Sequence, residues 1–148
     1  MRAVRALLVV VIVAACSSSA SPRLELVDAP PTKDVATLVA AERARALADG
    51  KQLLVYVGGT WCEPCKRFHD AAASGRLDDV FGQLRLLVFD ADRDEQALVT
   101  AGYRFTMIPM FAVPALDGRS TGRRIEGSVK GEGAVDQITP RLRTLVER

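Results

Sequence analysis

Hydrophobic and polar positions recur along this chain with two spacings, and each spacing predicts one kind of element. Between residues 33 and 49 the apolar side chains recur at helical spacing, and Gly50 follows where the C-terminal cap of a helix belongs. Residues 52–57 are a short apolar run that ends in two glycines, Gly58 and Gly59, which predicts a strand buried on both faces. This part of the chain therefore predicts a helix followed by a central strand.

The same two patterns continue to the C-terminus. They predict a helix over 62–73, strands over 84–89, 110–113 and 123–126, a short helix over 93–101 and a last helix over 132–147. The last helix contains Pro140, so we expect a kink there or a start delayed to Thr139. Connections that contain a helix favour parallel strands, whereas the short turn at Asp117 and Gly118 favours an antiparallel pair. The predicted fold class is α/β, with a mixed sheet of four strands, or five, and helices on both faces.

The first residues follow neither pattern. Arg2 and Arg5 precede an unbroken apolar run over 6–15, which is shorter than the roughly 20 residues that a membrane-spanning helix needs. We therefore interpret residues 1–15 as a signal peptide. Residues 13–16 resemble the lipobox of bacterial lipoproteins, which implies cleavage before Cys16 and a lipid on this cysteine. The alternative is an ordinary cleavage site that leaves Cys16 discarded or free.

The composition of the chain and the positions of its small polar residues and prolines predict the domain organisation. Small polar residues after Cys16 and two prolines before Thr32 predict a flexible tether over 16–31 and one folded domain over 32–148. The chain is 49% hydrophobic and 26% charged, as is ordinary for a globular protein. Removal of Arg2 and Arg5 from the 20 basic residues leaves 18 to balance 18 acidic ones, which excludes a nucleic-acid partner that needs a strong basic charge.

Two cysteines carry the chemistry of the folded part. Cys62 and Cys65 lie at the start of a predicted helix that directly follows a strand. The free N–H groups and the dipole of a helix N-terminus stabilise a thiolate, so Cys62 is the expected nucleophile. Cys65 lies one turn further along the helix and is the expected resolving cysteine. A zinc site would need four ligands, and the chain offers only His69 as a further nitrogen ligand. No metal or other cofactor is therefore expected, and a purely structural disulfide remains the alternative.

Residues 60–66, Thr-Trp-Cys-Glu-Pro-Cys-Lys, resemble the Trp-Cys-x-Pro-Cys-Lys active site of the thioredoxin superfamily. The resemblance covers about residues 33–147 and implies a thioredoxin-like fold, with Trp61 beside the catalytic cysteines. Residues 103–109 resemble the family segment that ends in a cis-proline facing the cysteines, which makes Pro109 the candidate for this residue. The resemblance implies that Ile108 binds the extended substrate chain.

The chain departs from the family at four positions. The buried Asp and the Lys of the family's proton relay are replaced by Tyr56 and Leu86. Met107 and Met110 stand where the family has Gly and Thr on either side of the cis-proline, which makes both methionines candidate substrate-binding residues. Filling gaps in the core is the equally reasonable alternative for both.

His69 is the one histidine of the chain, and it lies four residues after Cys65 on the same helix face. Because Tyr56 and Leu86 occupy the relay positions, we count His69 as a candidate catalytic residue that accepts the Cys65 proton. An ordinary surface histidine is the alternative.

The sequence thus predicts a bacterial lipoprotein of the cell envelope that acts as a thiol–disulfide oxidoreductase. It is expected to be exported and anchored to a membrane, facing the periplasm or the cell exterior. Residues 58–61 and the Cys-Lys-x-Phe pattern resemble reducing members of the family, so protein disulfides are the expected substrates, and an upstream reductant protein is the expected partner. The alternative is a tethered, non-enzymatic binding module with a structural disulfide.

Overall fold

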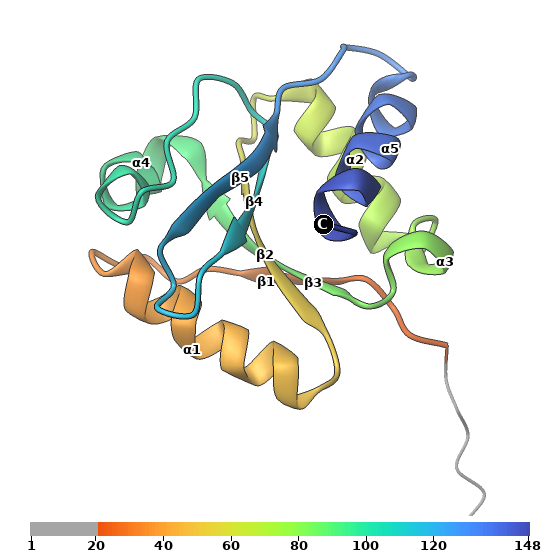
Figure 1. Cartoon of the computed structure of the whole chain (residues 1–148). Coiled ribbons are helices and arrows are strands. Elements are labelled where there is room, and N and C mark those ends of the chain that lie inside the picture. Colours follow the sequence, from red (N-terminus) through yellow and green to blue (C-terminus); the bar gives the residue numbers. More distant parts are fainter. Residues whose placement is uncertain (1–20) are drawn as a thin grey trace, which may run out of the picture.

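Five strands build the sheet at the centre of the protein, which a computed structural model describes over residues 21–148 (Figure 1). The strands are β1 (Glu25–Asp28), β2 (Gln52–Gly58), β3 (Leu84–Asp90), β4 (Met110–Pro114) and β5 (Ser120–Glu126). They lie in the order β1-β3-β2-β4-β5, where β1, β3 and β2 are parallel and β4 and β5 are antiparallel additions. The predicted mixed sheet is confirmed, with five strands.

Helices cover both faces of this sheet (Figure 1). They are α1 (Val35–Ala48), α2 (Glu63–Ala73), α3 (Asp78–Phe81), α4 (Ala91–Thr100) and α5 (Ala134–Val146). The helices α1 and α4 pack against one face of the sheet, and α2, α3 and α5 pack against the other. Within residues 21–148 no helix combines the length and the apolarity that crossing a bilayer requires.

The central strand β2 shows why its apolar run has no alternation. Successive side chains of a strand point to opposite faces of the sheet. Leu54 and Tyr56 therefore join the core under α2 and α5, whereas Val55 and Val57 join the core under α1 and α4. Because both faces are covered, every residue of β2 after Gln52 is buried.

The N-terminal boundary predicted for the domain is wrong. The segment predicted as a tether over 16–31 contains β1, which pairs with residues 85–88 of β3 at the edge of the sheet, and Leu24 and Ala29 beside it are buried. The strand is only four residues long and has no extended apolar run, so its sequence does not mark it as a strand.

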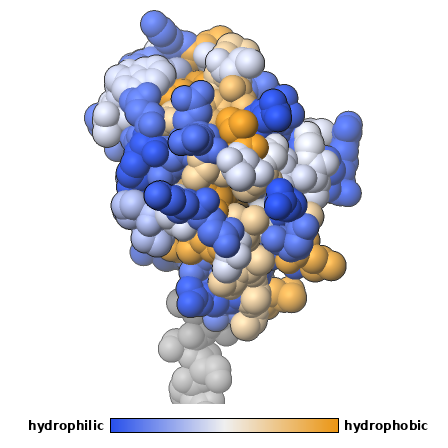
Figure 2. All heavy atoms as spheres, turned by 90° about the vertical axis from the view of Figure 1, so that its left-hand side faces the viewer, coloured by the Kyte–Doolittle hydropathy of each residue, from blue (hydrophilic) through white to orange (hydrophobic). Residues whose placement is uncertain are grey.

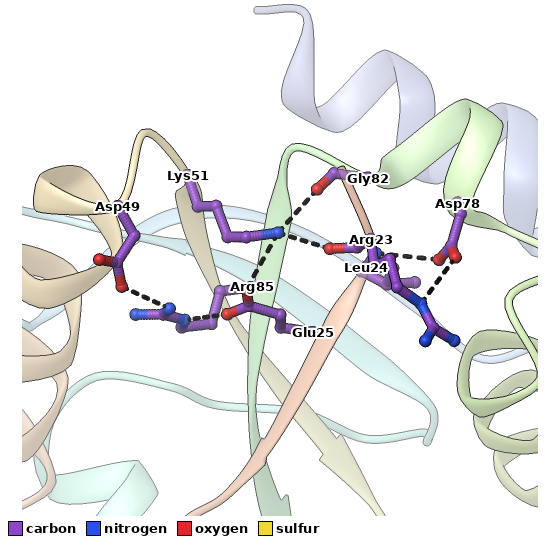
Figure 3. Close-up of polar contacts among 8 residues, drawn as sticks. All are labelled: Arg23, Leu24, Glu25, Asp49, Lys51, Asp78, Gly82 and Arg85. Atoms are coloured by element: carbon purple, nitrogen blue, oxygen red, sulfur yellow. Dashed lines mark hydrogen bonds and ion pairs between the residues drawn. The ribbon is translucent and has the colours of Figure 1, made fainter. Parts of the chain in front are cut away.

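Charged side chains from distant segments hold β1 in place (Figure 3). The Lys51 Nζ donates to the Gly82 carbonyl at 2.8 Å and to the Arg23 carbonyl, and it pairs with Glu25 at 3.2 Å. Arg85 joins Glu25 at 2.6 Å and Asp49 at 2.7 Å. These contacts, which we call the Lys51 clamp, explain why a short polar strand is ordered.

Of the two alternatives predicted at Pro140, a kink or a start delayed to Thr139, the delayed start is wrong, because α5 begins at Ala134 and continues through Pro140. Its buried side chains lie on both sides of the proline, so packing against the sheet favours one continuous helix. A proline leaves the carbonyl four residues earlier without a partner, and that residue, Asp136, is exposed to water. The predicted signal peptide over 1–15 and the predicted lipid site Cys16 lie outside the described residues.

Candidate active site

The two cysteines form a disulfide where β2 passes into α2. Cys62 is the N-cap of α2, and its Sγ accepts a hydrogen bond from the Cys65 N–H at 3.2 Å. The two Sγ atoms are bonded at 2.05 Å, and both residues are almost fully buried. Pro64 fits the first turn of α2, where a helix needs no N–H donor. The sequence thus places both sulfurs at the N-terminus of one helix, as predicted.

Ile108 and Pro109 lie on the approach to β4, and their peptide bond is cis. The cis-proline expected at this position is therefore present. Ile108 lines the same groove as Cys62, a cavity of about 480 Å³ that also contacts Trp61 and Pro64. The fold thus brings the segment before β4 to the turn that carries the disulfide, although the two are more than forty residues apart in the sequence.

The two candidate methionines have different surroundings. Met107 is 57% exposed and packs against Gly127, beside the cavity that Trp61 and Ile108 also line. Met110 lies in β4, is fully buried and belongs to the core under α1 and α4. Its side chain therefore fills the core and does not reach a substrate, which corrects the prediction for Met110.

Trp61 is the most exposed apolar side chain beside the disulfide, at 66% exposure. Its Nε1 donates to the Asp92 carboxylate at 2.8 Å, which fixes the indole ring over the start of α4. Figure 2 shows hydrophilic side chains and small apolar patches mixed on the face of the molecule that carries α1 and α4.

A second cavity, of about 620 Å³, lies on the side of Cys65. Cys65, Tyr56 and His69 all line it. The Tyr56 hydroxyl donates to the Cys65 carbonyl at 3.2 Å, and burial raises the pKa of Tyr56, so this phenol stays protonated at neutral pH. His69 is exposed and lies one turn after Cys65 on α2. The structure thus brings His69 and Cys65 to one cavity.

Charged side chains complete the lining of this cavity: Asp28, Lys66, Asp70, Asp90 and Arg93. Lys66 pairs with Asp70 at 2.6 Å, and this bond lowers the pKa of the Asp70 carboxyl, with a smaller contribution from the charge of His69. Asp28 could not be placed here from the sequence, because it ends the strand β1 that sequence reasoning missed. Leu86, at the other relay position, is fully buried in the core.

Glu63 is a site residue that sequence reasoning did not single out. Its carboxylate accepts from the backbone N–H of Gly131, at 2.9 Å for Oε2 and 3.2 Å for Oε1, and it pairs with Arg67. The bond to Arg67 lowers the pKa of Glu63 most, and the Gly131 N–H and the charge of Lys130 lower it further. No sequence signal connects Glu63 with Gly131, which follows 68 residues later. Among residues 21–148 no group of three or more His, Cys, Asp or Glu side chains is arranged to hold a metal ion.

Comparison with solved structures defines the fold class. A wild-type thioredoxin h from poplar is similar to this chain with a TM-score of 0.51 and 21% sequence identity, over 85% of this chain and 98% of that chain. With the five-stranded mixed sheet and its helices, this similarity defines an α/β protein with the thioredoxin-like fold, as predicted.

Two further thioredoxin structures are similar to the chain at a TM-score of 0.49. A mutant thioredoxin from Halobacterium salinarum is 18% identical over 87% of this chain and 93% of that chain, and the thioredoxin of Trichomonas vaginalis is 17% identical over 86% and 98%. No protein-family model and no curated protein sequence matches the chain. The chain thus combines the thioredoxin-like fold with a Cys-Glu-Pro-Cys disulfide at residues 62–65.

Proposed function

We propose that this chain is a thiol–disulfide oxidoreductase that reduces protein disulfides. The observation that carries the proposal is the Cys62–Cys65 disulfide at the N-terminus of α2, beside a groove lined by Ile108. A sulfur at a helix N-terminus is stabilised as a thiolate and leaves readily when the disulfide is attacked. The backbone before β4 then lies where an extended substrate chain can pair with it.

The reaction balances over two exchange steps. In the dithiol form the Cys62 thiolate attacks one sulfur of a substrate disulfide, which forms a mixed disulfide and releases one substrate thiolate. Cys65, as a thiolate, then attacks the Cys62 Sγ, which restores the Cys62–Cys65 disulfide and releases the second substrate thiolate. The substrate gains two electrons and the protein loses two. A dithiol protein of the envelope then reduces the disulfide again.

His69 is our candidate for the group that takes the proton from the Cys65 thiol before the second step. Two observations support this role. His69 and Cys65 line one cavity of about 620 Å³, and Tyr56, at the position of the family's acidic relay residue, stays protonated at neutral pH because it is buried. A histidine changes its charge between about pH 5 and 8, the range in which this proton transfer is useful.

The cellular setting is proposed from the sequence. The apolar run over 6–15 followed by Cys16 supports export and a lipid on Cys16 that holds the protein to a membrane, with the active site in the periplasm or outside the cell. The partners are then protein thiols and disulfides of the cell envelope. Neither nucleic acid nor a bound metal takes part in this proposal.

Reduction of insulin by the dithiol form of the protein tests the activity. We expect turnover with an added dithiol reductant, and we expect none from Cys62→Ser, which serves as the matched control. Equal rates for the two proteins would leave only a binding module braced by a disulfide. A reduction potential close to that of strong oxidants, about −120 mV, instead of thioredoxin-like values near −270 mV, would refute the reducing direction.

A further inference from the structure

The carboxylate of Glu63 connects the redox-active turn to a distant loop. Glu63 stands between the two cysteines in sequence, and both of its carboxylate oxygens accept from the N–H of Gly131. Gly131 belongs to the segment over 127–133 that joins β5 to α5. One side chain of the Cys-Glu-Pro-Cys motif therefore holds a piece of backbone that lies on the far side of the groove.

The two ends of this loop are fixed without Glu63. At its beginning the Gly127 N–H donates to the Pro109 carbonyl at 2.9 Å, and Arg141 of α5 donates to the carbonyls of Glu126 and Gly127, both at 2.8 Å. At its end the Ala134 N–H donates to the Gly131 carbonyl at 3.1 Å, which starts α5.

The middle of the loop depends on Glu63. Within the described part of the chain, the bond from Gly131 to Glu63 is the one hydrogen bond that ties residues 128–132 to anything outside the loop and α5. Gly131 has a φ of +87°, a conformation that favours glycine, and nothing lies within 4 Å of where its Cβ would be. No neighbour therefore packs against the side of Gly131 on which a side chain would lie.

The same loop forms one wall of the groove beside the disulfide. Ser128, Lys130 and Gly131 line the cavity of about 480 Å³ from one side, and Ile108 lines it together with Cys62. The position of the loop therefore sets the width of the groove into which a substrate chain would pass on its way to Cys62.

We propose that Glu63 is a positioning residue that fixes this wall and so sets the affinity for extended peptide disulfides. The inference rests on the proposed function, because it concerns the substrate of the same site. A small disulfide that touches only the sulfur atoms does not need the wall. A peptide that lies in the groove contacts it over several residues, so loss of the Gly131 bond weakens peptide binding selectively.

The hydrogen bond from Gly131 to the ionised Glu63 carboxylate is present throughout the physiological pH range. The contacts with Arg67 and Gly131 lower the pKa of Glu63, so its ionised form persists below the pH at which a free glutamate would take up a proton. A carboxyl with a lowered pKa loses its bonds only as the pH falls through that lowered value. Glu63 therefore acts as a fixed brace at neutral pH.

Two substitutions of Glu63 distinguish the effect of its hydrogen bond with Gly131 from the effect of its negative charge. Glu63→Gln and Glu63→Ala both remove the negative charge next to Cys62 and the ion pair with Arg67, so any electrostatic effect on the thiolate is common to both. The glutamine amide still offers an oxygen to the Gly131 N–H, whereas alanine offers none. Glu132→Ala, in the same loop but with no hydrogen bond to the groove, controls for a change in the loop itself.

The experiment compares KM and kcat for a disulfide-bonded peptide and for bis(2-hydroxyethyl) disulfide. We expect Glu63→Ala to raise KM for the peptide roughly fivefold over Glu63→Gln, the effect of one ordinary hydrogen bond, with equal kcat. The two variants should reduce the small disulfide at the same rate as each other. Amide exchange at Gly131 should be faster in Glu63→Ala than in Glu63→Gln, in the oxidised protein without substrate.

Equal peptide KM values for the two variants, or equal exchange at Gly131, would overturn the inference. A KM for the small disulfide that rises as much as the peptide KM would overturn it as well, because the effect would then concern the sulfur atoms and not the groove. These results, with an active wild-type protein, leave the proposed function standing. A wild-type protein that reduces neither disulfide would instead refute the proposed function.

Discussion

Replacing Lys51 by methionine tests whether the Lys51 clamp holds the edge strand β1. Methionine keeps an unbranched apolar stem of similar length and removes the ammonium group, so packing changes little. The Lys51 side chain is only 11% exposed, and its ammonium donates to the carbonyls of Arg23 and Gly82. Both carbonyls lose a charged donor in the variant.

The expected loss follows from these contacts. A hydrogen bond from a charged donor contributes about 1.5–3 kcal/mol. The variant loses two such bonds, but it no longer has to desolvate a mostly buried ammonium group, and this offsets part of the loss. The ion pair with Glu25 adds less than about 1 kcal/mol, because Glu25 is partly exposed and keeps its contact with Arg85. We therefore expect Lys51→Met to lower the free energy of unfolding by about 2–3 kcal/mol.

Urea denaturation of the oxidised protein measures this loss, with Lys33→Met as the control. Lys33 is exposed, and its side chain makes no hydrogen bond or ion pair with any other residue of 21–148, so its variant should stay within about 0.5 kcal/mol of wild type. Amide exchange should show the loss of protection first at β1, for instance at Ala29, whose N–H donates to the Val88 carbonyl at 2.8 Å. The reasoning fails if Lys51→Met unfolds at the same urea concentration as Lys33→Met.

Three further predictions concern the chemistry and the setting. Cys65→Ser should accumulate partner proteins in mixed disulfides, visible on non-reducing gels, because Cys62 still attacks and nothing resolves the product; full turnover by this variant would reverse the assigned roles. His69→Ala should slow the second exchange step and shift its pH profile in stopped-flow measurements between about pH 5 and 9, while alkylation of Cys62 changes less; coincident profiles would make His69 an ordinary surface residue. Cys16→Ser should move the protein from the membrane fraction to the soluble fraction, and unchanged fractionation would contradict lipid anchoring.

The central elements could be read from the sequence because their patterns are local. The run over 52–57 is apolar throughout, since β2 is covered on both faces, and the helical spacing after Cys62 marks α2 directly. The resemblance of residues 60–66 and 103–109 to the thioredoxin superfamily indicates the cysteines and the cis-proline, and the helical connections with the short turn at Asp117 and Gly118 indicate the mixed sheet. Such signals need no knowledge of what lies far away in the chain.

The features that were missed depend on distant partners. Strand β1 is ordered by Lys51 and Arg85, which come about 25 and 60 residues after it, and nothing in the sequence connects them with it. Met110 follows the cis-proline in sequence, but strand alternation in β4 turns its side chain into the core. The bond between Glu63 and Gly131 likewise joins the first residue of α2 to a loop, and only the folded sheet brings the two together.

Because β1, β3 and β2 are parallel, the N-terminal start of the domain and the Cys62–Cys65 disulfide lie at opposite ends of the sheet. The described chain begins four residues before β1, at the end of the sheet where β1 starts, whereas Cys62 follows the far end of β2, and the strands run side by side in register (Figure 1). Seven residues of strand span about 23 Å. With the proposed lipid on Cys16, the nine residues over 17–25 extend at most about 32 Å to the start of β1. The disulfide would then face away from the membrane, within about 55 Å of the bilayer. Partners would be met in the aqueous layer above the membrane, and a pull on the anchor would act first on β1 and the Lys51 clamp that holds it.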